Sequence, residues 1–286
     1  MAYENFIPEV WCEAIQRELE RSYVFVEDCN RQYEGEVKNR GAQVHILGVG
    51  KPTIKTLARE AADGAIADPE TIEDKIVTMP IEQISYFNYK VGDIDRAQAV
   101  NGVMDALSKE TSEALADTAD RYVAGKIADA EKLYTSAAIK VVSGTAGSGE
   151  KNVLDVLDEA IQKLYENDVK NSTEVVVTVS PRFYTLFKRA YVGRDTDNSA
   201  MLKNGRVATY GNVIVKMSNN VLRTDEGATD NIMIRTKRAL AFAQPLTHIE
   251  PYRPEKMFAD AVKGFILYDA KIVRPAEILN INVKYA

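Results

Sequence analysis

Apolar positions recur every three or four residues from Asp95 to Tyr134, and this spacing places them on one face of a helix. Asp95 and Gln98 resemble a capping box that would open such a helix. The pattern therefore predicts one amphipathic helix of roughly 40 residues and about 60 Å, longer than a compact domain requires. Its apolar positions are Val100, Val103, Met104, Leu107, Ala114, Leu115, Ala119, Tyr122, Val123, Ile127, Ala130, Leu133 and Tyr134.

Three segments before this stretch show the composition of β-strands, namely Val44–Leu47, Lys75–Met79 and Ile84–Val91. The chain between the first two strands is polar and charged, and it contains Gly64 and Pro69. It offers little that could form a core, so a long two-stranded excursion would be marginal by itself in water. We therefore expect this excursion to lie on a partner surface.

The second half of the chain begins with a small-residue hinge at Gly144–Gly149, followed by a helical stripe from Val153 to Tyr165. Glu174–Val179 is a run of β-branched residues typical of a strand covered on both faces. Ser180 and Pro181 then supply an N-cap and a first-turn proline for a helix through Tyr191. A mixed α/β subdomain is predicted here.

Further strands are predicted at Val207–Met217, turning at Tyr210–Asn212, and at Ile232–Ile234, and Thr236–Gln244 is predicted as a short helix stopped by Pro245. Later strands are predicted at Phe265–Tyr268 and Ile272–Val273. In the last strand, Leu279, Ile281, Val283 and Tyr285 alternate with Asn280, Asn282 and Lys284, so one buried face is expected. The simplest architecture inserts an α/β subdomain, residues 152–245, into a β-plus-helix subdomain.

The amino-terminal segment reads as a short amphipathic arm. Pro8 is tolerated in a first helical turn, and an apolar stripe follows it. Aromatic residues are common both in protein cores and at subunit interfaces. The arm could therefore pack on its own domain or on a neighbouring subunit. The stripe consists of Val10, Trp11, Ala14, Ile15 and Leu19.

Composition narrows the protein class. The 286 residues are 45% hydrophobic, enough for a substantial core. No apolar run reaches the 18 residues of a membrane crossing and no secretory signal is evident, so a soluble cytoplasmic protein with reduced Cys12 and Cys29 is expected. The net charge of −6 lacks a basic block, which argues against a dedicated nucleic-acid binder.

Candidate catalytic motifs are weak. The Gly144–Gly149 run precedes a helix, as a phosphate-binding loop does, but Glu150 follows it where a Walker loop needs lysine, so a connector is favoured. His45 and His248 stand in no metal or nucleophile spacing. Asp117 and Asp120 lie on the polar side of the predicted long helix and are expected to be solvated.

A basic cluster alternates with Tyr191 and Tyr210 and could suggest a nucleic-acid patch. Asp195 and Asp197 dilute its charge, and charged rims are common at interfaces, so a solvated or subunit-facing loop is favoured. The cluster consists of Lys188, Arg189, Arg194, Lys203 and Arg206.

Several of these segments, in this order, resemble a tailed-bacteriophage major capsid protein of the Hong Kong 97 phage type. They are the Phe6–Trp11 arm, the excursion, the long helix, Ser180–Tyr184, Gly211–Val215 and Ala239–Pro245. The resemblance implies an α+β Hong Kong 97-type major capsid fold. It divides the chain into an N-arm (1–38), an E-loop (39–82), a P domain with the spine helix (83–145), an A domain (146–245) and P-domain return strands (246–286).

The resemblance implies a structural coat protein, not an enzyme. Copies would self-assemble as hexamers and pentamers into an icosahedral shell enclosing viral double-stranded DNA without sequence-specific binding, and without a membrane or cofactor. A separate scaffolding protein and a portal protein would be partners, because the arm begins close to Met1. The protein would occupy the virion capsid after assembly in the host cytoplasm. An encapsulin-like nanocompartment shell and an α/β enzyme using Gly144–Gly149 on a nucleotide are the alternatives.

The resemblance and the charge pattern nominate subunit-interface residues in the arm, the E-loop and the basic cluster. No catalytic, cofactor-binding or metal-binding residue is nominated. Crosslinking between subunits is not predicted, because no asparagine and catalytic glutamate match the E-loop lysines. The interface candidates are Phe6, Trp11, Lys51, Lys55, Arg59, Lys75, Arg189 and Arg194.

Overall fold

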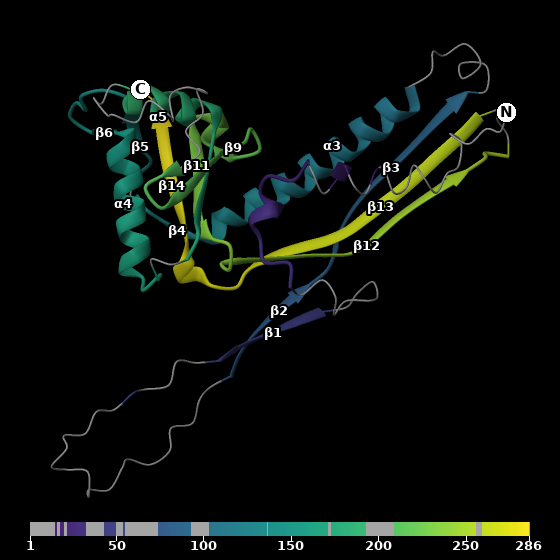
Figure 1. Cartoon of the computed structure of the whole chain (residues 1–286), viewed down its shortest axis with the longest axis horizontal. Helices are drawn as coiled ribbons and strands as arrows, with labels where there is room; N and C mark the ends of the chain where they lie inside the picture. The colour runs from purple at the N-terminus through teal and green to yellow at the C-terminus, as the bar shows by residue number, and fades with distance from the viewer. Residues whose placement is uncertain are drawn as a thin grey trace, which may run out of the picture.

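A computed structural model describes residues 15, 18–19, 22–32, 43–49, 54, 74–92, 103–135, 137–170, 173–192, 209–255 and 259–285. The described chain forms three sheets (Figure 1). The largest has nine strands, the second has three, and the third is the hairpin of β1 (Gln43–Val49) and β2 (Asp74–Pro80). The hairpin confirms the first two predicted strands.

The nine-stranded sheet and its two helices form the first part of the molecule, here called the nine-stranded unit. Its main strand order is β6-β5-β14-β11-β7-β9-β8, with β10 beside β11 and β4 beside β14. The strands are β4 (Glu131–Lys132), β5 (Ile139–Val142), β6 (Glu150–Asn152), β7 (Val175–Val179), β8 (Thr209–Tyr210), β9 (Val213–Met217), β10 (Leu222–Thr224), β11 (Thr229–Thr236) and β14 (Ile278–Tyr285).

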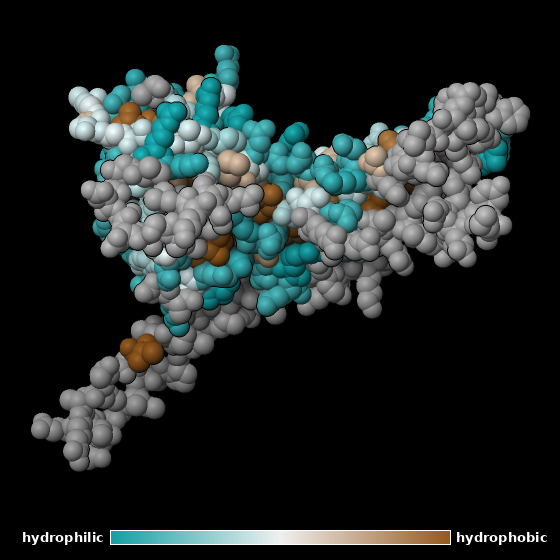
Figure 2. Space-filling model, turned by 45° about the horizontal axis from the view of Figure 1, so that its top comes forward, coloured by the Kyte–Doolittle hydropathy of each residue, from teal (hydrophilic) through white to brown (hydrophobic). Residues whose placement is uncertain are grey.

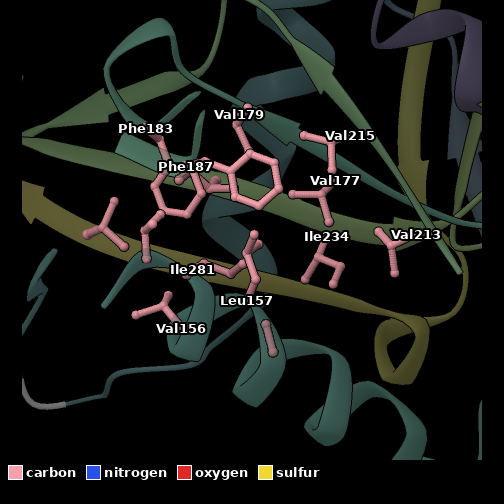
Figure 3. Close-up of a cluster of buried hydrophobic side chains, with 14 of the residues drawn as sticks. Val156, Leu157, Val177, Val179, Phe183, Phe187, Val213, Val215, Ile234 and Ile281 are labelled. Carbon is pink, nitrogen blue, oxygen red and sulfur yellow. The ribbon is translucent and has the colours of Figure 1, made fainter. Parts of the chain in front are cut away.

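Helices α4 (Val153–Glu166) and α5 (Pro181–Val192) pack on one face of this sheet, and their apolar sides meet the β-branched residues of β7 and β9 (Figure 3). Both helices start where the sequence predicts. Asn152 accepts the Leu154 N–H at 2.9 Å, and the Ser180 hydroxyl accepts the Phe183 N–H at 3.3 Å. Apolar side chains on β14 and β11 complete this core from the sheet side.

The second part, the long-helix unit, combines α3 (Val103–Gly125) with the three-stranded sheet, ordered β12-β13-β3. The strands are β12 (Leu240–Tyr252), β13 (Ala259–Ile272) and β3 (Gln83–Gly92). In Figure 1 this unit runs away from the nine-stranded unit as a helix beside a narrow sheet. The predicted strands at Ile84–Val91 and Phe265–Tyr268 are confirmed.

The long helix exists, but it ends before the predicted Tyr134. A 3-10 turn, η5 (Lys126–Asp129), follows it, and β4 then pairs in parallel with β14. Leu133 N–H donates to the Asn280 carbonyl at 2.8 Å. Pairing with a distant strand therefore overrides the helical periodicity after Gly125, and the predicted start at Asp95 lies outside the described residues.

The predicted helix at Thr236–Gln244 is wrong, because the chain turns after Thr236 and continues as β12. Leu240 and Phe242 face the core under α3, whereas Ala241 and Ala243 face the base of the β1–β2 hairpin. A strand covered on both faces is apolar throughout, so its periodicity does not distinguish it from a buried helix. Pro245 lies in the irregular register between Ala243 and Leu246.

The last strand also differs from its prediction, because both of its faces are buried. Asn280 and Asn282 are 0% and 7% exposed. The Asn282 side chain donates to the Tyr134 carbonyl at 2.7 Å and accepts the Tyr134 N–H at 3.2 Å. These amides tie the chain after α3 to the large sheet, so polar alternation here marks an internal contact instead of solvent exposure.

The final strands separate between the two units. β13 pairs with β3 in the long-helix unit, whereas β14 pairs with β11 and β5 in the nine-stranded unit. The expected division grouped residues 246–286 with residues 83–145. β13 pairs with β3 of that segment, and β14 pairs with its strands β4 and β5. β12 spans the expected boundary after residue 245 and belongs to the three-stranded sheet, and the domain bounds stay a prediction.

Candidate interaction surfaces

The base of the β1–β2 hairpin is anchored on the three-stranded sheet. Val44, Ile46 and Met79 are at most 3% exposed and pack against Leu267 and neighbouring alanines of β12. Lys271 Nζ also donates to the Thr78 carbonyl at 2.7 Å. The described base of the excursion is therefore covered by the protein's own sheet.

Ile54 lies between the two hairpin strands in sequence and behaves differently. Its side chain is 88% exposed, the largest exposure among the exposed large apolar residues of the described chain. Figure 2 shows a mainly hydrophilic described surface on which apolar residues form small separate areas. A single exposed isoleucine is ordinary on a protein surface, so Ile54 is a candidate contact residue only because the excursion around it is poor in core residues.

An aromatic row crosses the face of the three-stranded sheet on which the hairpin base also packs. Tyr86 on β3, Phe265 on β13 and His248 on β12 are register partners. The His248 and Phe265 rings lie 5.7 Å apart, and the Tyr86 side chain is 79% exposed. Lys263 and Glu250 form an ion pair of 3.2 Å beside the row. The combination of apolar rings and a charged edge is typical of contact surfaces.

The structure describes only two of the eight predicted interface residues. Lys75 belongs to β2, where its backbone pairs with Gly48, and Arg189 is exposed on the last turn of α5. Figure 1 places β2 and α5 in separate parts of the molecule, so they do not form one patch. The other six, Phe6, Trp11, Lys51, Lys55, Arg59 and Arg194, lie outside the described residues.

The glycine-rich segment Gly144–Gly149 does not present a free phosphate cradle. The Glu150 carboxylate accepts the Gly147 N–H at 3.3 Å, and Asn152 donates to the Gly144 carbonyl at 2.9 Å. A carboxylate already bound to the loop amide would repel a phosphate. This geometry supports the connector interpretation over the nucleotide-binding one.

A catalytic pocket, a metal site and a membrane-spanning helix are the other functional features that the described residues could contain. A pocket of about 670 Å³ is lined by Val141, Val142, Ser143, Arg182, Thr185, Leu186 and Tyr285, so its described lining includes no His, Cys, Asp or Glu. Within the described part of the chain, no group of three His, Cys, Asp or Glu residues could hold a metal ion. No helix among those residues is long and apolar enough to cross a membrane.

Cys29 is buried, and burial raises the pKa of its thiol to about 11. The carboxylates of Asp120 and Asp28 raise it further, and the Arg235 guanidinium lowers it. A thiol with this pKa is mostly protonated at neutral pH and is a poor nucleophile. Cys12 lies outside the described residues.

Asp120 is the main polar residue that the sequence interpretation misplaced. Its side chain is 1% exposed, whereas Asp117 is exposed as predicted. Its carboxylate accepts the N–H groups of Val24 at 2.8 Å and of Phe25 and Val26 at 3.1 Å. No pattern in α3 distinguishes Asp120 from its solvated neighbours, because the partner lies almost 100 residues away in sequence.

Burial raises the Asp120 pKa to about 6, and it outweighs the three backbone hydrogen bonds that lower it. The folded protein therefore holds this proton more tightly than the unfolded chain. The stabilising contribution is complete below about pH 4 and declines as the pH rises through 6. Between pH 4 and pH 7 we expect the unfolding free energy of the wild type to fall by roughly 2–3 kcal/mol relative to that of Asp120→Asn.

Urea unfolding at several pH values measures this difference. Glu110→Gln, which removes an exposed charge from the same helix, is the control and should show no comparable change. A pH-independent difference between wild type and Asp120→Asn would contradict the assignment.

Comparison with known proteins found solved structures of similar architecture. The structure described as Mycobacterium phage Che8 aligns at a TM-score of 0.69 and 26% identity, over 90% of each chain. The capsid structure of the cyanophage P-SCSP1u aligns at 0.68 and 15% identity, over 92% of this chain and 88% of that one. The virus-like particle from Pyrococcus furiosus aligns at 0.56 and 13% identity, over 96% and 98%. No family model and no curated protein matches the chain.

Proposed function

We propose that this chain, which has the Hong Kong 97-type fold of tailed-phage major capsid proteins, is the structural subunit of a closed protein shell. The observation that carries this proposal is the alignment with the Che8 phage structure over 90% of both chains. Because the alignment covers nearly the whole of both chains, it includes both the nine-stranded unit and the long-helix unit. A shared α/β motif by itself would align over only part of the chain. The fold expected from the sequence is confirmed, and the tailed-phage capsid resemblance is supported by these neighbours.

The proposed assembly consists of hexamers and pentamers that close into an icosahedral shell around double-stranded DNA. A repeated heterologous contact between identical subunits closes into rings. The exposed Ile54 and the aromatic row are surfaces that such contacts would cover. The net charge of −6 suits a wall that encloses DNA without adhering to it.

The remaining parts of the proposal concern the setting of the shell. The protein would reside in the virion capsid after assembly in the host cytoplasm, with a scaffolding protein and a portal protein as further partners. In this proposal the protein has a structural role only and uses no catalytic residue or cofactor. The geometry at Gly144–Gly149, where Glu150 occupies the loop amide, supports this over a nucleotide-dependent enzyme.

A second candidate is a shell that encloses cargo proteins instead of DNA. It is favoured by the likeness to the virus-like particle from Pyrococcus furiosus, which covers 96% of this chain. Both candidates predict a closed particle, and they differ in its contents.

Electron microscopy of the purified protein, expressed alone and together with the genes that flank its own, tests the proposal. We expect uniform closed particles whose maps contain hexameric and pentameric units. Extraction of nuclease-protected DNA from particles made during infection supports the viral capsid, whereas protein cargo supports the alternative. Small oligomers under every assembly condition would contradict both.

A further inference from the structure

The segment Tyr23–Asn30, here called the strap, crosses the junction between the two units. It contains η2 (Val26–Asp28) and is largely buried, with Phe25 and Val26 at most 1% exposed. Its residues contact α3 and β12 of the long-helix unit and β9 and β11 of the nine-stranded unit.

The strap is bound to the long-helix unit at both ends. The Asp120 carboxylate of α3 accepts the three consecutive N–H groups of Val24, Phe25 and Val26. At the other end, Asn30 N–H donates to the Leu240 carbonyl at 2.8 Å, and the Asn30 carbonyl accepts the Phe242 N–H at 3.0 Å. These bonds fix the strap backbone in direction as well as in position.

The strap is bound to the nine-stranded unit by two cations. Arg235 on β11 donates from Nη2 to the Phe25 carbonyl at 2.6 Å. Lys216 on β9 places Nζ 2.7 Å from Asp28 and 2.8 Å from Glu27. Hydrogen bonds with a charged partner are shorter and roughly twice as strong as neutral ones.

Arg235 is fully enclosed where it binds the strap. Its side chain is 1% exposed, and within the described chain its Nε has no hydrogen-bond partner. A buried cation with an incomplete set of partners is a poor way to stabilise a core, and apolar residues of similar size often do better. Directional binding of a distant backbone carbonyl is what this arginine supplies and an apolar side chain would not.

We propose that the strap is a conformational device that fixes the angle between the two units. Around it the units share apolar contacts, since Met233 and Ile278 of the large sheet pack in the same core as Ile127 after α3. Asn220, just before β10, adds two solvent-exposed hydrogen bonds to α3, at 3.2 Å to Arg121 and 2.9 Å to Asp117. Apolar contacts are non-directional and tolerate small rotations, whereas the Asp120 and Arg235 bonds do not. If the protein forms a shell as proposed above, this angle sets how neighbouring subunits meet.

Distance measurement between spin labels on the two units tests the proposal. Exposed Ala114 on α3 and exposed Asp158 on α4 would be changed to cysteine in the unassembled full-length chain carrying Cys12→Ser. Wild-type contacts should give one narrow distance distribution. Asp120→Ala, which leaves the N–H groups of Val24, Phe25 and Val26 without this acceptor, should at least double its width. Asp120→Asn, which keeps one acceptor oxygen, should broaden it less.

Hydrogen exchange supplies a second readout. The Val24–Val26 amides should exchange at least about tenfold faster in Asp120→Ala, since a lost charge-assisted bond is worth more than one factor of ten. Lys216→Gln, at a partly exposed side chain, provides a milder variant if Asp120→Ala does not fold, and Glu110→Gln is the charge-matched control. Lys216→Gln should also broaden the distribution, and the control should not.

Unchanged distance distributions in folded strap variants would overturn the proposal, even if the Val24–Val26 amides exchange faster, because the bonds would then be local. This measurement does not depend on assembly. Failure of the wild-type protein to form particles would contradict the proposed function alone and leave the strap result intact.

Discussion

Replacing Gly50–Glu73 with an Asn-Gly turn should abolish closed particles while leaving the subunit folded. Val49 and Asp74 are register partners, so a two-residue turn joins β1 to β2 without changing their pairing. The apolar contacts of the hairpin base lie outside the replaced segment, and a shorter loop has a smaller closure entropy. The removed segment contains the exposed Ile54 and the predicted interface residues Lys51, Lys55 and Arg59.

Particle yield by sedimentation and electron microscopy measures assembly, and circular dichroism with thermal unfolding measures the subunit. Ile54→Asp should reduce assembly in the full-length chain, and the conservative Ile54→Leu should retain it. Normal particle yield from the Asn-Gly replacement would show that this segment has no role in subunit contacts. An unfolded replacement variant would instead show that the segment is part of the subunit's own core.

Gly264→Val should have the largest effect on subunit stability. Gly264 lies on β13, the central strand of the three-stranded sheet, and the Phe87 ring covers it. A Cβ at this position would lie 2.7 Å from the ring and 2.9 Å from the His248 carbonyl oxygen. The ring can rotate, but the carbonyl belongs to the paired backbone of β12. We expect a loss of about 3 kcal/mol in unfolding free energy, at the upper end of overpacking effects.

Chemical denaturation detects this change as a lower midpoint. Gly125→Ala is the matched control, because no atom lies within 4 Å of its Cβ position, and it should be neutral or stabilising by up to about 1 kcal/mol. Combining Gly264→Val with Phe87→Ala removes the ring contact and should cost less than the sum of the two single changes. Equal midpoints for wild type and Gly264→Val would contradict the close approach.

The predictable elements are those whose signals are local. The α4 stripe with its Asn152 cap, the buried β7 run and the Ser180-Pro181 start of α5 are set by neighbouring residues, and all three are confirmed. The errors occur where a distant partner decides. Residues after Gly125 pair with β14, and the apolar run after Thr236 becomes a strand because two cores cover it.

The candidate surfaces, too, were predictable only where their signal is local in the sequence. The sequence indicated that the excursion between β1 and β2 is polar and poor in core residues, and Ile54 is exposed there. It gave no sign of the aromatic row, because Tyr86, Phe265 and His248 come together only through strand pairing across the sheet. It also placed Asp120 in solvent, since residues three or four apart on a helix look alike until a partner segment covers one of them.

By itself, the sequence determined the local units of this protein: its caps, its β-branched strands, the existence of a long amphipathic helix and the order of segments from which the capsid fold was recognised. These depend on interactions between residues close in the chain. The tertiary structure alone decided where the helix stops, which unit receives each final strand, and which charges are buried. Those outcomes depend on contacts between residues far apart in sequence, such as Asp120 with Val24, whose partners no local pattern identifies.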